Sequence, residues 1–263
     1  MEIAAPSVLI SIVTYNSKHI FKVLDQLKSE FDMNKQFKFV VFDNNSSIEY
    51  QEELKTYIPF ISVNFYSENN GFGFGHNYNL LQAKEDYFLV LNPDVILKKN
   101  DLLNMIQVME SSNRIGLTVP RVLNSDGTTQ YLIRNRVSVF DYALRFIPFK
   151  VIKKMFNKRL SQYECRNLSL DKNIPVRIGS GCFMLLNSLA YKEVGGFDDR
   201  YFMYFEDYDL CLELEKRNYK IIYCPTSTII HFYEKEAHKN RELFKIFMQS
   251  MYKFFNKWGW RFF

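Results

Sequence analysis

Acidic residues follow three aliphatic or aromatic runs in this sequence. Asp43 ends the run at residues 37–42, and Asp94 follows a second such run after an Asn-Pro turn. Glu206 and Asp207 follow a run of aromatic residues where a helix is predicted to begin. A carboxylate can hold a divalent cation, accept a hydrogen bond from a ligand or take up a proton. Each position alone is explained as well by a turn or a helix cap, so function depends on whether the fold brings these side chains together.

Apolar runs alternate with helical patterns through the first half of the chain. Helical spacing or composition follows the first three of four predicted strands, which are residues 8–13, 37–42, 61–66 and 87–91. This alternation predicts right-handed βαβ units and a mostly parallel sheet. The loops after the first, second and fourth strands then meet at one edge, where open α/β sheets bind ligands. We therefore expect Thr14, Asp43 and Asp94 to face one cleft.

The second half is predicted to add two helices and more strands. One helix, capped by Asn100, runs from residue 101 to about residue 111, and another begins at Glu206 and ends near residue 218. A turn of small residues leads into a buried strand within residues 178–186. The other strands are predicted at residues 115–122, 220–224 and 228–232. The last of these carries His231.

Three glycines alternate with aromatic residues after the third strand. Gly71, Gly73 and Gly75 do not have the GxGxxG spacing of the dinucleotide fingerprint, and they follow the wrong strand for it. Two interpretations stay open. The segment is either a flexible turn or a place where the backbone comes close to a sugar or a phosphate.

Composition indicates a globular protein with an anionic partner. The 263 residues are 47% apolar and 17% aromatic, with a net charge of +5, which does not distinguish nucleotide, phospholipid and nucleic acid. The four cysteines form no CxxC pair, which favours a reducing compartment. The first residues lack the basic start of a signal peptide, and no apolar run approaches the roughly 20 residues of a spanning helix. We expect a cytoplasmic protein.

Two segments combine basic and aromatic residues. Residues 134–159 hold eight basic residues against the single acid Asp141, a pattern typical of a solvated helix face or of a segment at an anionic membrane, with nucleic acid a distant third. Residues 239–263 have an apolar stripe at three- and four-residue steps with lysines around it. We expect this C-terminal stripe to form a membrane-surface helix, and the alternative is that it packs on the core.

Six short motifs in order resemble the inverting family 2 glycosyltransferases of the GT-A fold, and within them bacterial rhamnosyltransferase-like enzymes. The motifs are Val13-Thr14-Tyr15-Asn16, Val41-Phe42-Asp43-Asn44, Asn70-Gly71-Phe72-Gly73, Leu91-Asn92-Pro93-Asp94, Gly179-Ser180-Gly181 and Tyr204-Phe205-Glu206-Asp207-Tyr208-Asp209-Leu210. The resemblance implies an α/β, Rossmann-like, mostly parallel sheet flanked by helices, with a C-terminal helical extension. It divides the chain into a GT-A domain, residues 1–237, and an amphipathic helix, residues 238–263. Within the domain, residues 1–122 would bind the nucleotide sugar and residues 123–237 the acceptor.

The same resemblance implies a role for each site residue. Asp207 would be the catalytic base, with Glu206 as the fallback. Asp94 and His231 would bind Mg²⁺ or Mn²⁺, whereas Asn92, a neutral amide where the family's DxD element has its first acid, would bind a cation only weakly. Asp43 would accept a hydrogen bond from N3–H of a uracil or thymine ring. The full set implied to bind the nucleotide sugar is Thr14, Tyr15, Asn16, Asp43, Asn70, Gly71, Asn92, Ser180 and Gly181.

The implied partners are a dTDP- or UDP-sugar, above all dTDP-rhamnose, and a lipid-linked saccharide of cell-surface polysaccharide synthesis, with no nucleic acid. A peripheral position on the inner face of the cell membrane would suit such an acceptor. Two alternatives remain open at this point. A sugar-nucleotide pyrophosphorylase would need a glycine-rich basic signature that residues 8–17 lack, and a non-catalytic nucleotide-sugar-binding subunit has only Asn92 in its favour.

Overall fold

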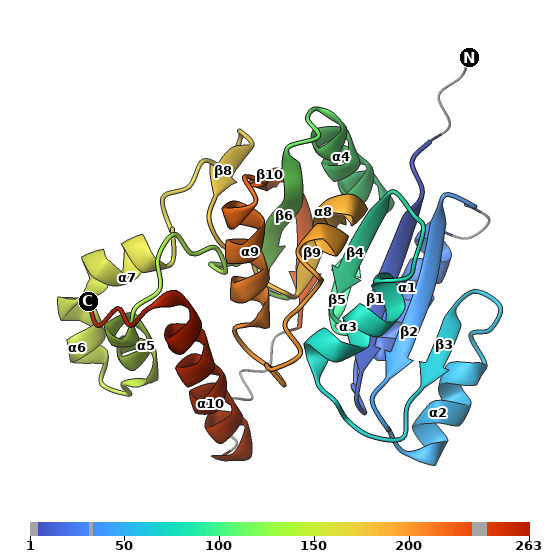
Figure 1. Ribbon diagram of the computed structural model, residues 1–263, viewed down its shortest axis with the longest axis horizontal. Helices are drawn as coiled ribbons and strands as arrows, with labels where there is room; N and C mark the ends of the chain where they lie inside the picture. Colours follow the sequence, from blue (N-terminus) through green and yellow to red (C-terminus); the bar gives the residue numbers. More distant parts are fainter. Residues whose placement is uncertain (1–4, 32–33, 233–240) are drawn as a thin grey trace.

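A sheet covered by helices forms the centre of this computed structural model, which describes residues 5–31, 34–232 and 241–263 (Figure 1). Its strand order is β3-β2-β1-β4-β9-β6-β10-β5, with β7 paired to β6 and β8 to β10. The strands are β1 (Val8–Thr14), β2 (Phe37–Asp43), β3 (Ser62–Phe65), β4 (Tyr87–Leu91), β5 (Val95–Leu97), β6 (Ile115–Leu123), β7 (Thr129–Gln130), β8 (Ile174–Val176), β9 (Phe183–Asn187) and β10 (Lys220–His231). The helices are α1 (Ile20–Phe31), α2 (Ile48–Lys55), α3 (Phe72–Leu80), α4 (Lys99–Glu110), α5 (Val139–Phe146), α6 (Lys150–Met155), α7 (Asn157–Tyr163), α8 (Ser188–Glu193), α9 (Glu206–Lys216) and α10 (Arg241–Trp258).

The first half of the sheet is parallel, as the sequence predicts. Strands β3, β2, β1 and β4 pair in parallel, and every residue of β1 and β4 is buried because helices cover both faces. Thr14 lies directly opposite Asp43 in the register of β1 and β2. The predicted convergence of strand ends at one edge is therefore confirmed for this pair.

The second half joins the first through an antiparallel strand. Strand β9 pairs antiparallel with β4 on one side and with β6 on the other, and β6 is followed by β10 in parallel. Because β9 runs against β4, the turn before β9 lies at the same edge as the end of β4. The small-residue turn around Gly181 and the segment carrying Asp94 thus reach the same part of the molecule. Both halves contribute strands to one sheet. The assignment of residues 1–122 to the nucleotide sugar and of residues 123–237 to the acceptor stays a prediction.

Two local predictions were wrong, and one of the two interpretations left open for the glycine segment is excluded for Gly73 and Gly75. Helix α4 begins at Lys99 with Lys98 at its N-cap, so Asn100 is not the cap, and Glu30 of α1 accepts a hydrogen bond from the Lys99 amide at 3.1 Å. The strands predicted at residues 220–224 and 228–232 are one strand, β10, with a register shift between Cys224 and Thr228. Gly73 and Gly75 are not in a flexible turn, because α3 begins at Phe72 and includes both.

The two glycines inside α3 allow the helix to pack closely on its neighbours. A Cβ atom on Gly75 would lie 2.8 Å from Phe42 and Val13 side chains, and one on Gly73 would lie 2.9 Å from Phe197. Real Cβ atoms do not approach other atoms that closely. These glycines therefore serve close helix packing.

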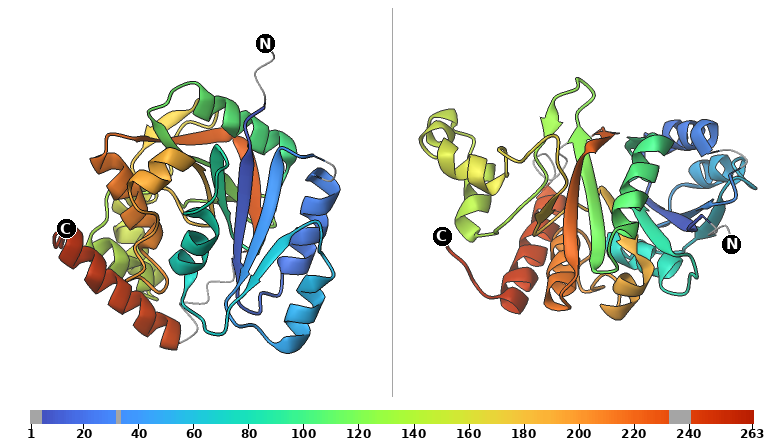
Figure 2. Two further views of the ribbon diagram at one scale, coloured as in Figure 1. Left: turned by 45° about the vertical axis from the view of Figure 1, so that its right-hand side comes forward. Right: turned by 90° about the horizontal axis from the view of Figure 1, so that it is seen from above.

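Helix α10 packs against the protein. It buries Phe247, Met251, Phe254 and Phe255 of its apolar stripe, together with Ser250. Figure 2 shows α10 lying between α9 and the helices α5 to α7. The expectation that this stripe faces a membrane is thus wrong, because protein covers it. Within the described part of the chain, no helix combines the length and apolar character needed to cross a bilayer.

Candidate functional site

The buried carboxylate of Asp43 marks one end of the candidate site. Its Oδ2 atom accepts hydrogen bonds from the Ser46 amide at 3.1 Å and from Nε2 of Gln51 at 2.8 Å. Its Oδ1 atom is buried and has no hydrogen-bond partner. Leaving a buried charged acceptor unpaired is costly, so this oxygen needs a donor from outside the chain. An N–H group of a planar base would meet that need.

The loop after β1 supplies an exposed ring and a brace near Asp43. The Tyr15 side chain is exposed, whereas the Thr14 hydroxyl is buried and hydrogen-bonded to the hydroxyl of Tyr50. Asn16 joins this loop to the loop after β2, because its amide donates to Ser46 Oγ at 2.8 Å and its side chain accepts from the Ser47 amide at 2.9 Å. Of the predicted residues here, Tyr15 and Asn16 are exposed, and Thr14 is buried.

Asn44 connects the base end of the site to the glycine at residue 71. Its side chain donates to the carbonyl of Gly71 at 3.1 Å and accepts from the amide of Asn70 at 3.2 Å. Gly71 has a φ of 92°, and a Cβ there would lie 2.0 Å from the carbonyl oxygen of Phe202. The loop that carries Asn70 and Gly71 is thereby held against the segment that leads into α9. Sequence reasoning missed Asn44 as a site residue, although it stands beside Asp43 in a quoted motif.

Asp94 and His231 face each other across the next part of the edge. Oδ1 of Asp94 is buried without a hydrogen-bond partner, and it lies 3.4 Å from Nε2 of His231. The antiparallel pairing of β5 with β10 sets this distance, because Val95 lies opposite His231 in the register. Two metal ligands each about 2.1 Å from one ion can be that far apart.

The orientation of His231 is fixed by Gln130. The Gln130 amide nitrogen donates to the His231 carbonyl at 2.8 Å, so its Oε1 faces Nδ1 of the imidazole at 3.0 Å. Oε1 can only accept, so Nδ1 is the donor in this contact, and Nε2 is the ring nitrogen that faces Asp94. An imidazole nitrogen and a carboxylate oxygen in this arrangement could bind one cation together. Within the described residues these two side chains form a pair, and no cluster of three metal-ligating side chains occurs.

The turn before β9 links this pair to the predicted base. The amide of Asn92 donates to the carbonyl of Cys182 at 3.0 Å, and the amide of Gly181 donates to Oδ2 of Asp207 at 2.9 Å. The Cys182 thiol is buried, and its pKa is raised to about 12 by that burial and, less strongly, by nearby charged groups that include Asp94 and Asp207. The turn therefore lies between the Asp94–His231 pair and Asp207.

Asp207 and Glu206 begin α9 with different environments. The Asp207 carboxylate is partly exposed and accepts amide hydrogen bonds from Gly181 and, at 2.9 Å, from Tyr208. Burial raises its pKa to about 6, while these hydrogen bonds oppose the rise. The buried Glu206 has an unpartnered Oε2 atom, and burial together with the charge of Asp207 raises its pKa well above the ordinary value. At neutral pH, Asp207 is then ionised and able to accept a proton. Glu206 holds its proton more tightly than an ordinary carboxyl group.

The backbone before α9 is strained and held by aromatic packing. Tyr204 and Phe205 have φ values of 70° and 69°, a left-handed conformation that is unfavourable for bulky residues. The ring of Phe205 lies 5.0 Å from Tyr142 of α5 and 5.3 and 5.2 Å from Phe247 and Phe254 of α10. Packing from two other helices thus holds this conformation and with it the position of Asp207.

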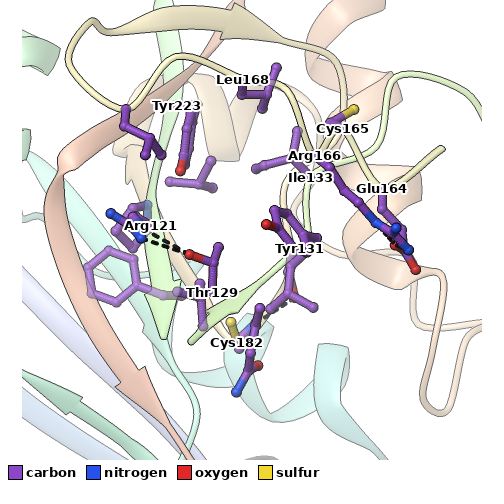
Figure 3. A pocket seen from close by; sticks show the side chains of 18 residues that line it. Arg121, Thr129, Tyr131, Ile133, Glu164, Cys165, Arg166, Leu168, Cys182 and Tyr223 are labelled. Carbon is purple, nitrogen blue, oxygen red and sulfur yellow. Dashed lines mark hydrogen bonds and ion pairs between the residues drawn. The ribbon is translucent and has the colours of Figure 1, made fainter. Parts of the chain in front are cut away.

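A cavity of about 170 Å³ opens beside the turn before β9. Its wall includes Ser180, Cys182 and Gln130. The cavity therefore adjoins both the Asp94–His231 pair and the turn that contacts Asp207. Figure 3 shows Cys182 at one end, Tyr223 at the other and Tyr131 between them. The wall mixes apolar side chains with polar and charged ones, a lining that suits a sugar.

The sequence matches one family over most of its length. The model for glycosyl transferase family 2 matches residues 9–195. Rhamnosyltransferase WbbL of Escherichia coli K12 is 31% identical over 251 residues, which cover 90% of this chain and 86% of that protein. An N-acetylglucosaminyl-diphospho-decaprenol L-rhamnosyltransferase of Mycobacterium tuberculosis is 27% identical over 174 residues, or 62% of this chain and 56% of that protein.

Solved structures share the fold at low sequence identity. GalNAc-T7 with UDP, GalNAc and Mn²⁺ has a TM-score of 0.65 at 15% identity, with 87% of this chain and 43% of that chain covered. A mannosyltransferase of Pyrobaculum calidifontis with GDP-Man and Mn²⁺ has a TM-score of 0.60 at 16% identity, with 89% and 59% covered. Both neighbours are GT-A glycosyltransferases, which confirms the predicted fold class.

Proposed function

We propose that this chain, which belongs to glycosyl transferase family 2, transfers L-rhamnose from dTDP-rhamnose with inversion onto a lipid-linked saccharide in cell-surface polysaccharide synthesis. The names of two relatives support rhamnose, and that of the mycobacterial relative supports a lipid-diphosphate acceptor. Family membership favours this transferase over a pyrophosphorylase or a non-catalytic subunit. A lipid-linked acceptor would place the enzyme peripherally on the inner face of the cell membrane.

The observation that carries the proposal is the position and protonation of Asp207. An inverting transfer needs one carboxylate to remove the proton of the acceptor hydroxyl as that hydroxyl attacks the anomeric carbon. Asp207 is partly exposed, ionised at neutral pH and held by the Gly181 amide, which leaves lone pairs for the incoming hydroxyl. Glu206 has no such access because it is buried, and its raised pKa disfavours the ionised form.

The donor would lie across the edge of the sheet. Oδ1 of Asp43 would accept N3–H of thymine, and the exposed ring of Tyr15 could stack on the base. Asn70, Gly71, Asn92, Ser180 and Gly181 come from the loops between Asp43 and Asp207 and would contact the ribose, diphosphate and sugar. The cavity beside Ser180 would take the acceptor sugar.

Asp94 and His231 would hold Mg²⁺ or Mn²⁺, because they present two facing acceptor atoms and one of those atoms is otherwise unpaired. When bound, such an ion offsets the negative charge that develops on the departing nucleoside diphosphate. Gln130 would orient the imidazole for this role. The Mn²⁺ in two structural neighbours is consistent with this assignment.

A thermal-shift panel tests the donor and the metal together, because a ligand that binds the folded state alone raises Tm. We expect dTDP-rhamnose with Mn²⁺ to raise Tm more than UDP-sugars or dTDP-rhamnose in EDTA. Transfer to a synthetic lipid-diphosphate N-acetylglucosamine, with the product anomer assigned by NMR, tests the acceptor and the stereochemistry. Equal shifts with every nucleotide sugar, or a retained anomer, would contradict the proposal.

A further inference from the structure

Three apolar side chains on or next to helix α6 are exposed to solvent. The exposed fractions of Phe149, Val151 and Met155 are 65%, 73% and 76%. Val151 and Met155 are four residues apart in a helix, so they share one face, and Phe149 immediately precedes that helix. Ile48 and Leu189 are equally exposed elsewhere, but each is a single residue on its own helix, which is ordinary for a protein surface.

Helices α5, α6 and α7 form what we call the basic lobe, which projects at one end of the molecule beyond α10 (Figure 1). Its one acid, Asp141, is buried and paired with Arg159 at 2.6 Å, so it does not offset the charge of the lysines. Lys154 and Lys158 are exposed, and no acid in the described ranges pairs with either. The apolar face of α6 is therefore bordered by uncompensated positive charge.

The C-terminal segment adds exposed aromatic rings to the same lobe. The amides of Val139 and Phe140, at the start of α5, donate to the carbonyls of Arg261 and Phe262 at 2.9 and 3.1 Å. This pairing fixes the segment to the lobe, and the Phe263 ring lies 5.3 Å from that of Phe140. Phe262 and Phe263 are nevertheless exposed. Aromatic rings next to lysines are typical of surfaces that sit at the lipid headgroup level.

We propose that the basic lobe binds an anionic lipid surface, with Phe149, Val151 and Met155 entering the headgroup region and Lys154 and Lys158 contacting lipid phosphates. The charge selects this occupant over a second copy of the chain, because two such lobes would repel each other. This inference rests on the proposed lipid-linked acceptor for its purpose, since an enzyme bound to the membrane meets such an acceptor at the surface. It replaces α10 as the predicted membrane contact.

The test is co-sedimentation of the full chain with vesicles of phosphatidylcholine, with and without phosphatidylglycerol, at low and high salt. We expect binding to the anionic vesicles alone, weakened by salt. Reversing two surface lysines, Lys154→Glu with Lys158→Glu, should lower the partition coefficient at least about thirty-fold, the equivalent of about 1 kcal/mol for each lysine. The charge-matched control is Lys28→Glu with Lys220→Glu, which are exposed residues outside the lobe and should leave binding within about threefold.

The apolar contribution has its own variant and control. Changing Phe149, Val151 and Met155 together to Ser should weaken binding at least about tenfold, because the lipid surface would no longer remove their apolar area from water. Ile48→Ser with Leu189→Ser removes two equally exposed side chains elsewhere and should have no effect. Transfer to a short-chain, water-soluble acceptor should stay unchanged in all four variants, so a failed transferase assignment would show in that assay and not in sedimentation. Equal sedimentation of all variants would overturn the proposal, and so would a dimer that the triple variant abolishes.

Discussion

The base assignment makes a quantitative prediction about the pH dependence of transfer. Asp207 must be ionised to accept a proton, and its pKa is about 6. The rate should therefore be constant above pH 7 and fall as the pH drops through 6, reaching about a tenth of the plateau at pH 5. Asp207→Asn should lower kcat by about 10²- to 10⁴-fold while the donor-induced rise in Tm is retained.

Glu206→Gln is the matched control for that substitution. Because Glu206 is buried and its raised pKa favours the protonated form, a neutral amide of the same shape should keep both the plateau rate and the acid limb within a few fold. If Glu206→Gln abolished transfer while Asp207→Asn kept it, Glu206 would be the base. Near-normal rates in both variants would refute general-base catalysis by this pair.

Arg134 provides a second test of the acid limb, which is the fall in rate as the pH drops through 6. Its guanidinium is buried, donates from Nη1 to the carbonyls of Tyr131 and Ile133, and lowers the pKa of Asp207 through its charge. Arg134→Met should move the acid limb to higher pH, whereas Arg134→Lys should leave it close to its original position. The limb is read from rates normalised to each variant's own plateau, so a partly unfolded sample does not change it. An unmoved limb in Arg134→Met would show that the titrating group is not Asp207.

Three further predictions follow from the geometry. Excess EDTA should abolish transfer, and Asp94→Ala should weaken Mn²⁺-dependent donor binding more than His231→Ala, because a carboxylate supplies charge to a hard cation; full activity in EDTA would contradict this. Gly71→Ala should lower stability by more than about 3 kcal/mol in urea unfolding, since its Cβ would meet the Phe202 carbonyl, whereas Gly127→Ala, with a φ of 82° and open space around it, should cost about 1 kcal/mol; equal losses would disprove the clash. Glu206→Gln should raise Tm relative to the wild type more at pH 8 than at pH 4. In the wild type, the raised folded-state pKa of Glu206 contributes stability that is complete below the unfolded value of 4.5 and is lost as the pH rises through the folded value. A Tm difference between the two proteins that does not change with pH would be inconsistent with this reasoning.

The parallel half of the fold could be predicted because its signals are local. The runs that form β1, β2 and β4 are apolar and end in polar turns, and α1 has clear helical spacing. The place of β9 could not be predicted in this way, since its pairing with β4 and β6 depends on contacts far apart in the sequence. The sequence pattern of the apolar stripe in α10 is the same whether protein or lipid covers the stripe. Only the tertiary structure shows that α5 and α9 cover it.

The carboxylates of the candidate site could be predicted from the sequence, but the groups that orient the site residues could not. Asp43, Asp94 and Asp207 each follow a recognisable run, and the structure brings them to one edge of the sheet with the Gly181 turn. Gln130 lies in a two-residue strand and has no local signature, yet it sets the protonated nitrogen of His231. The protonation difference between Glu206 and Asp207 also depends on burial, which two adjacent acids in a sequence do not reveal.

The central position of β9 has a consequence for how the chain folds during synthesis. Strand β9 alone joins β4 to β6 in the strand order, so these two strands are not connected until residue 187 has been made. Before that point, β4 has one unpaired edge, and all five of its residues belong in the core. An open apolar edge of this kind is a site for pairing with other chains. Nascent chains that stall between residues 91 and 183 should therefore be the ones that aggregate or recruit a chaperone.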